Sequence, residues 1–185
     1  MTKSPDTDAA EQLIERYAER IFQLAMRVTG DAEQAIEATE EAVRRIAREV
    51  NPAEDAARQK ACIDRITARA AYDALRRRAG GREELALADL LPPIDDDGHH
   101  FTPMPDWSAR LDGVPGPALN GALSAALDAL PPEYRVALVL RDAQAFTLED
   151  IAAVLGTSAA VAASRVHRAR LFVRQRLTRD LVSAA

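Results

Sequence analysis

The sequence predicts an all-α protein made of two small helical domains joined by a linker. Hydrophobic residues make up 48% of the 185 residues, enough for a core, while aromatic residues make up only 4%, which favours helix over sheet. Apolar residues recur at three- and four-residue spacing, the period of an α-helix, on both sides of a stretch rich in proline, glycine and aspartate. We therefore expect domains at residues 8–82 and 118–182 and an acidic linker at 83–117.

Three helices are predicted in the first domain. The first covers about residues 8–29 and ends at Gly30, and Asp31 is placed to cap the second. The second ends before Pro52, and because proline fits the first position of a helix, the third is expected to start there and to end at Gly80. The apolar face of the first helix comprises Leu13, Tyr17, Ile21, Leu24 and Val28, and the inner face of the second comprises Ile36, Thr39, Val43, Ile46 and Val50.

The second domain has the pattern of a helix-turn-helix. Thr147 and Asp150 are spaced as a capping box and open a short helix. Gly156 supplies the turn after that helix, and Thr157 or Ser158 caps a long helix rich in arginine. A short helix, a glycine turn and a long basic helix are typical of DNA-binding domains.

Charge is unevenly distributed along the chain. The formal net charge is −5, but eight basic against four acidic residues give residues 51–82 a net charge of +4, and six against one give residues 158–185 a net charge of +5. One arginine against eight acidic residues gives residues 83–120 a net charge of −7. Each helical domain can thus present a basic surface to nucleic acid, and we expect the acidic linker to lie against these surfaces in the free protein.

Cysteine content and hydropathy indicate a cytoplasmic protein without membrane insertion. Cys62 is the only cysteine, which excludes an intramolecular disulfide and fits a reducing compartment. No apolar run approaches the roughly 18 residues of a membrane-spanning helix, and the first residues lack the apolar region of a signal peptide. Cys62 has apolar neighbours and is expected in the core.

Each predicted domain contains a set of short motifs. The second domain has residues 129–135 (ALPPEYR), 140–142 (LRD), 148–152 (LEDIA) and 164–170 (SRVHRAR), and the first has residues 17–31, Ile66 and residues 72–78 (YDALRRR). The first of these sets resembles region 4 of the extracytoplasmic-function sigma factors, and the second resembles region 2 of the same family. The resemblance implies a subunit without enzymatic activity or cofactor. It would bind core RNA polymerase through the β′ clamp and the β flap, bind promoter DNA, and be controlled by an anti-sigma factor.

The resemblance also implies three groups of site residues. Core polymerase is expected to bind Glu37, Glu40, Glu41 and Arg44 on the second helix. The −10 promoter element is expected to bind Arg65, Arg69, Tyr72, Asp73, Arg76, Arg77 and Arg78. The −35 element is expected to bind Thr157, Ser158, Val161, Ser164, Arg165, Arg168 and Arg170. Without the resemblance, Glu37, Glu40 and Glu41 of the second helix also fit a solvated acidic face. On that face Glu40 would pair with Arg44 and Glu41 with Arg45.

Some positions depart from the family pattern. Glu40 replaces a glutamine, Cys62 stands where the family usually has tryptophan, and Arg69 where it often has asparagine. The last helix begins with apolar residues 159–163, although base recognition needs hydrogen-bonding groups. These departures keep open a second function, a sigma-like interaction protein that binds an anti-sigma partner without initiating transcription.

An enzyme built on the linker is the third hypothesis. Asp95, Asp96, Asp97, His99 and His100 place carboxylates and imidazoles within six residues, a composition that could suit a metal ion. A loop rarely holds the geometry that a catalytic metal requires, and the sequence has no metalloprotease, phosphate-loop or serine-hydrolase motif. We therefore expect a solvated turn, with no metal site and no catalytic residue.

Overall fold

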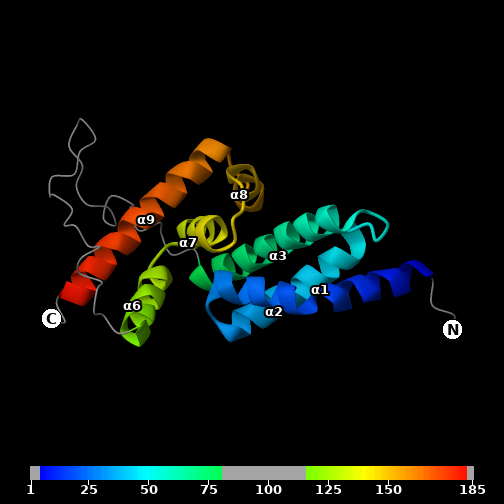
Figure 1. The fold of residues 1–185 in the computed structure, drawn as a ribbon, viewed down its shortest axis with the longest axis horizontal. Coiled ribbons are helices and arrows are strands. Elements are labelled where there is room, and N and C mark those ends of the chain that lie inside the picture. The colour runs from blue at the N-terminus through cyan, green and yellow to red at the C-terminus, as the bar shows by residue number, and fades with distance from the viewer. Residues whose placement is uncertain (1–4, 81–115, 183–185) are drawn as a thin grey trace.

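The computed structural model describes residues 5–80 and 116–182, and within these ranges every regular element is a helix (Figure 1). The all-α prediction is confirmed. The helices form two groups, α1–α3 and α6–α9. The predicted acidic linker and its Asp/His cluster lie outside the described residues. None of the described helices is long and apolar enough to cross a bilayer.

The first group is a three-helix bundle of α1 (Pro5–Thr29), α2 (Ala32–Glu49) and α3 (Ala56–Ala79), in which each helix packs against the other two. Gly30 has φ +68° and ends α1, and the Asp31 carboxylate accepts a hydrogen bond from the Gln34 N–H at 3.0 Å, as predicted. The fully buried side chains include Ile21, Val28, Ala38, Ala42, Ile46, Ile63 and Ala70.

The predicted start of α3 at Pro52 is wrong. Pro52 lies in a turn, and its carbonyl accepts a hydrogen bond from the Gln59 side chain. α3 begins after Asp55, whose carboxylate accepts from the N–H groups of Ala57 and Arg58. A carboxylate that accepts hydrogen bonds from two free N–H groups caps a helix more effectively than a proline does. Proline has no N–H group, so it only avoids adding one more unpaired donor.

The predicted inner face of α2 is partly wrong. Ile36 is 53% exposed, whereas Ala35, Ala38 and Ala42 are fully buried and share the inner face with Ile46. Alanine side chains let α2 approach its neighbours closely, and Ile36, one position after Ala35, is rotated toward solvent by about 100°.

A buried carboxylate ties α1 to α3. Asp64 accepts hydrogen bonds from Nε and Nη2 of Arg20 at 2.6 and 2.7 Å and from Nζ of Lys60 at 3.1 Å. The Asp64 side chain is 8% exposed, and its hydrogen bond raises the pKa of Arg20. Because Arg20 is on α1 and Asp64 on α3, the pair fixes the register of the two helices.

The second group comprises α6 (Gly116–Asp128), α7 (Pro132–Leu138), the π-helical turn η1 (Val139–Ala143), α8 (Leu148–Leu155) and α9 (Ala159–Val182), with α6, α7 and α8 packed along α9. The predicted helix-turn-helix is confirmed in α8 and α9. The Thr147 hydroxyl accepts from the Asp150 N–H, Gly156 has φ +67°, and the Ser158 hydroxyl accepts from the Val161 N–H.

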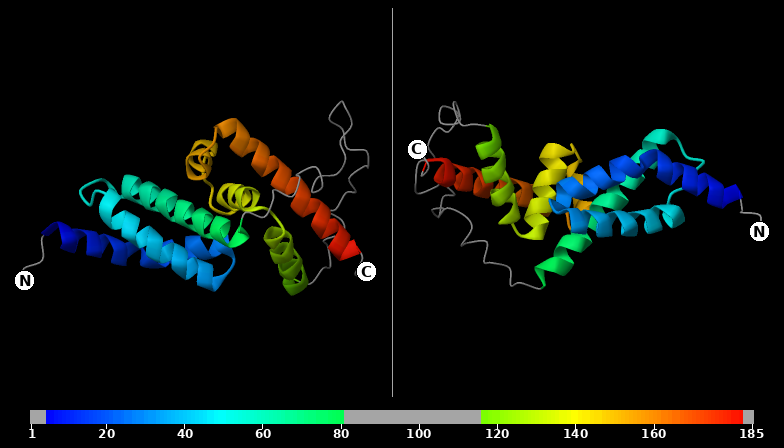
Figure 2. Two further views of the ribbon diagram at one scale, coloured as in Figure 1. Left: turned by 180° about the vertical axis from the view of Figure 1, so that it is seen from behind. Right: turned by 90° about the horizontal axis from the view of Figure 1, so that it is seen from below.

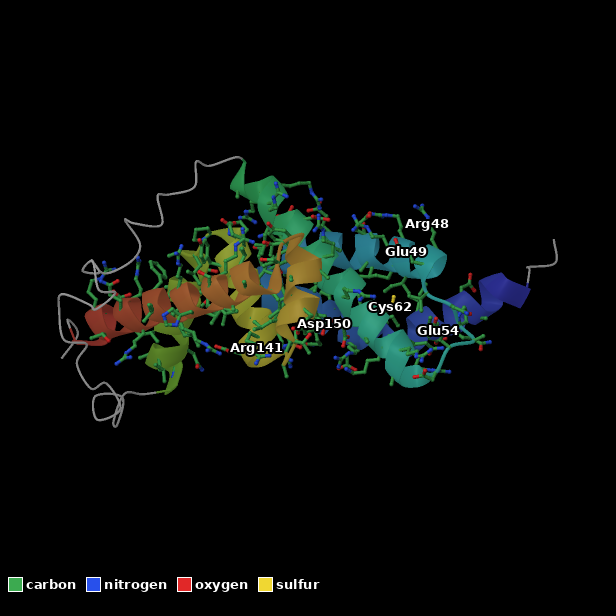
Figure 3. The ribbon with its side chains drawn as sticks, turned by 90° about the horizontal axis from the view of Figure 1, so that it is seen from above. Arg48, Glu49, Glu54, Cys62, Arg141 and Asp150 are labelled. Atoms are coloured by element: carbon green, nitrogen blue, oxygen red, sulfur yellow. The ribbon has the colours of Figure 1, made fainter. Side chains whose placement is uncertain are left out.

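The turn before α8 was not predicted. η1 is followed by Ala145, which has φ +56°, a backbone conformation that favours glycine. The Arg141 guanidinium donates to the Phe146 carbonyl at 2.8 Å and braces this turn, and Asp150 lies in the first turn of α8, which follows it (Figure 3). A strained residue is therefore held between two well-packed helices.

The two groups pack directly against each other. α7 and α8 contact α3, and η1 contacts α1. Figures 1 and 2 show α7 and α8 beside α3. One continuous cluster of buried side chains runs from Ile63 and Ala70 of α3 to Val136, Ile151 and Val154 of the second group. We refer to this packing of α7 and α8 on α3 and the end of α1 as the closed arrangement.

Candidate nucleic-acid interface

One face of α9 presents polar and cationic groups. Val161, Ser164, Arg165 and Arg168 follow at three- and four-residue steps and therefore lie on the same side of the helix. Val161, Ser164 and Arg168 are exposed and Arg165 is half-buried. The opposite side, which includes Ala162, Val166 and Ala169, is buried in the core. Thr157 and Ser158, in the turn before α9, complete this face at its N-terminal end.

Arg170 does not belong to this face. Its guanidinium donates two hydrogen bonds to the Asp142 carboxylate, at 2.9 and 2.5 Å, and this carboxylate raises the pKa of Arg170. Five residues after Arg165, it lies on a different side of the helix. The structure therefore brings together the predicted −35 residues except Arg170, which braces α9 against η1.

The C-terminal end of α3 carries three exposed arginines. Arg77 donates to the Glu37 carboxylate of α2 at 2.7 Å, and Arg78 lies 3.4 Å from the Asp31 carboxylate. Arg76 is exposed, and so is Arg65, three turns earlier on α3. These solvent-exposed ion pairs are weak, so each arginine can exchange its carboxylate partner for a phosphate.

Tyr72 lies inside the closed arrangement. It is 6% exposed and its ring lies between the guanidinium carbons of Arg69 and Arg76, 5.7 and 5.6 Å from the ring centre. Burial raises the pKa of its phenol. Asp73 pairs with Arg69 at 3.2 Å and with Arg45 at 3.5 Å. In the closed arrangement the Tyr72 ring is therefore covered and cannot stack on a base.

The outer face of α2 is acidic. Both predicted intrahelical pairs are present: Arg44 lies 4.0 Å from Glu40, and Arg45 donates to Glu41 at 2.7 Å. Hydrogen bonds from Arg45 and Arg44 hold the pKa of Glu41 below its ordinary value. Glu37 and Glu40 remain exposed beside Ile36, whose exposure the sequence analysis had missed. Carboxylates around one exposed aliphatic side chain form a small surface suited to binding a protein.

Comparisons with known proteins agree with these features. Residues 120–173 match the family model for sigma-70, region 4. Over 170 residues the chain is 32% identical to the ECF RNA polymerase sigma factor SigE of Mycolicibacterium smegmatis, covering 91% of this chain and 62% of that protein. It is 24% identical to the ECF RNA polymerase sigma factor SigW of Bacillus subtilis, covering 97% of this chain and 94% of that protein.

The chain is thus similar to extracytoplasmic-function sigma factors over most of its length. Its fold is similar to that of the sigma factor RpoE in a co-crystal with the anti-sigma factor NepR from Bartonella quintana, with a TM-score of 0.52 and 20% identity. That similarity covers 95% of this chain and 98% of the other. It concerns the fold alone.

No cluster of three or more histidine, cysteine or acidic side chains that could hold a metal lies in residues 5–80 and 116–182. Cys62 is half-buried on α3 and packs against the core cluster, as expected from its neighbours (Figure 3). The polar groups on the faces of α2, α3 and α9 described above are arginine, hydroxyl and carboxylate groups.

Proposed function

We propose that this chain is a sigma factor that binds core RNA polymerase and directs it to promoter DNA in the cytoplasm. The observation that supports the proposal most strongly is the outer face of α9, which presents Ser164, Arg165 and Arg168 within the segment that matches sigma-70 region 4. We assign promoter binding to two domains, residues 8–82 and 118–182, joined by the linker at 83–117.

The outer face of α9 binds the −35 element. Arg165 and Arg168 supply charge for phosphates and donors for base edges, while Ser158 and Ser164 supply hydroxyl groups. Because residues 159–163 are apolar, base recognition depends on few groups, and methyl contacts and groove shape contribute to the preference. We expect a weak or narrow promoter preference.

The −10 element binds along α3. Arg65, Arg76, Arg77 and Arg78 are exposed cations spread over four turns of helix, suited to successive phosphates of one strand. Arg69, Tyr72 and Asp73 add a guanidinium, an aromatic ring and an acceptor for an unstacked base. The last three act only when α3 is uncovered.

Core polymerase binds the outer face of α2 through Glu37, Glu40, Glu41 and Arg44, with the β′ clamp as the partner surface, and the β flap binds the second helical group. An anti-sigma factor competes for these surfaces. The complex of the similar RpoE with NepR supports a partner of that kind.

Binding of core polymerase to wild type and three variants tests the proposal. Glu37→Arg should abolish binding because it reverses the charge of the docking carboxylate. Arg77→Ala is the matched variant: it removes the same 2.7 Å ion pair but leaves the carboxylate, and it should bind like wild type. Glu49→Arg, exposed three turns further along α2, controls for a charge change alone.

Two results would contradict the proposal. Equal binding by Glu37→Arg and wild type would remove the docking role of α2. No binding by any folded variant would favour the sigma-like interaction protein, a hypothesis that the carboxylate at Glu40 keeps open. In that case an anti-sigma factor would be the partner to seek.

A further inference from the structure

We infer that Val161 determines part of the DNA sequence preference of this chain, by contacting the C5 methyl group of a thymine in the major groove. This inference rests on the proposed function, which assigns the outer face of α9 to the −35 element. It names the side chain, the base and the group on the base that makes the contact. Thymine and uracil differ only in that methyl group, so a change in the DNA alone can test the contact.

Core packing and helix stability do not account for the exposure of Val161. Its side chain is 42% exposed, whereas Ala162 beside it is fully buried. Valine is also a weaker helix former than the alanines that surround it at positions 159, 160, 162 and 163. The other large hydrophobic side chains that residues 5–80 and 116–182 expose, Ile36 and Leu123, lie on α2 and α6. Val161 is therefore an apolar group placed on the polar and cationic face of α9.

Val161 lies at the end of α9 that reaches base edges in a helix-turn-helix. α9 begins at Ala159, and the Ser158 hydroxyl accepts a hydrogen bond from the Val161 N–H at 3.3 Å, which fixes the first turn. The N-terminal residues of the second helix are the ones that contact base edges in this motif. Arg165 and Arg168 follow on the same side of α9, about 6 and 11 Å further along at 1.5 Å per residue, and can bind phosphates while Val161 faces a base.

The side chains around Val161 leave thymine as the base that this end of α9 can select. Residues 157–164 carry hydroxyl and methyl groups and no amide, carboxylate or cationic side chain. Bidentate contacts to guanine or adenine need those longer side chains, and a contact to cytosine needs a carboxylate. The hydroxyls of Ser158 and Ser164 can donate or accept, so they discriminate little between bases. Thymine alone presents a methyl group in the major groove, and Val161 is the largest apolar side chain in this segment.

The preference that one methyl contact produces is small. Burial of a single methyl group changes an affinity by about fourfold at room temperature. A bidentate hydrogen-bonded contact to a purine discriminates by about fivefold to a hundredfold. Recognition through Val161 therefore agrees with the weak or narrow promoter preference that the apolar start of α9 predicts.

Three variants separate the methyl contact from other effects. Val161→Ala removes both methyl groups of valine and introduces a better helix former. Leu123→Ala is the matched control, because Leu123 is also an exposed aliphatic side chain of the second group, 38% exposed, but lies on α6. Arg168→Ala removes a cation from the same face and should weaken binding to thymine and uracil duplexes by the same factor.

The experiment uses the full chain bound to core polymerase and a duplex that this complex selects from a random-sequence pool. Each thymine of the selected duplex is replaced in turn by deoxyuridine, which removes the methyl group and keeps every hydrogen-bonding group. We expect one thymine at which the replacement lowers the affinity of wild type about fourfold and that of Val161→Ala less than about twofold. Leu123→Ala and Arg168→Ala should keep the full fourfold difference at that thymine.

Equal losses in wild type and folded Val161→Ala at every thymine would overturn the inference, and so would a selected duplex that is insensitive to deoxyuridine throughout. If Val161→Ala fails to fold, Val161→Thr, which exchanges one methyl group for a hydroxyl, takes its place in the comparison. Failure of the proposed function has a different appearance. The chain would not bind core polymerase, or no sequence would be selected from the pool, and the role of Val161 would fall with it.

Discussion

Replacing Asp64 with asparagine should destabilise the three-helix bundle by about 2 kcal/mol. The buried carboxylate accepts three hydrogen bonds from two cations, at 2.6, 2.7 and 3.1 Å. Removing one partner of a fully buried ion pair costs about 3–5 kcal/mol. Arg20 and Lys60 are partly exposed and regain water, so the cost falls below that range, to about 2 kcal/mol. For a chain of this size, about 2 kcal/mol corresponds to a fall in Tm of roughly 4–8 °C.

Asp142→Asn is the matched control, since the Asp142–Arg170 pair has the same two-bond geometry but an exposed carboxylate. It should change the unfolding free energy by less than about 0.5 kcal/mol. Urea unfolding followed by circular dichroism measures both variants. Equal losses for Asp64→Asn and Asp142→Asn would refute the reasoning, because burial of the carboxylate is the difference between them.

Three further predictions concern the turn before α8, the α2 cap and the α9 face. Ala145→Gly should raise the unfolding free energy by about 1 kcal/mol in urea unfolding, since glycine removes the strain at φ +56°; no gain would show that the turn is unstrained. The Gln34 N–H donates to Asp31 and holds the pKa of that carboxyl below its ordinary value, so its ionised form stabilises the fold above about pH 4 and this contribution is lost as the pH falls. The stability difference between wild type and Asp31→Asn should therefore shrink in unfolding curves taken at progressively lower pH, and a constant difference would contradict this. Arg168→Ala should reduce the slope of log affinity for DNA against log salt by about 1, whereas Arg170→Ala should leave this slope unchanged. Equal slopes for the two variants would show that both arginines contact phosphates or that neither does.

Local features of the fold could be predicted from the sequence because their partners are close along the chain. The Asp31 and Thr147 side chains each accept a hydrogen bond from an N–H three residues later, and Gly156 takes a backbone conformation that few other residues adopt. Where two local signals competed, the prediction failed: Pro52 and Asp55 both fit a helix start, and only the carboxylate satisfies free N–H groups. Ile36 was misplaced because alanine, which carries little weight in a hydrophobic pattern, forms the inner face of α2.

The candidate site could be predicted only in part. The α9 face follows from helical spacing. The hydrogen bonds from Arg69 to the Val154 carbonyl and from Arg135 to the Val28 carbonyl join residues 85 and 107 positions apart, and no local pattern encodes such contacts. The same holds for Asp64, whose Arg20 partner is 44 residues away. Its one local signal was Lys60, four residues earlier on the same helix.

The buried alanines of α3 limit which substitutions this protein can accept during evolution. Ala68, Ala70 and Ala71 have no exposed surface, and neighbouring helices approach α3 where these side chains are small. A larger residue at any of them would push a helix away, at a cost of typically about 1–3 kcal/mol for an overpacked core, and nothing smaller than alanine except glycine is available. Few neutral substitutions are therefore available at the centre of the bundle. Adaptation to new promoters or partners must occur on the outer faces of α2 and α9, where side chains can be exchanged without moving the backbone.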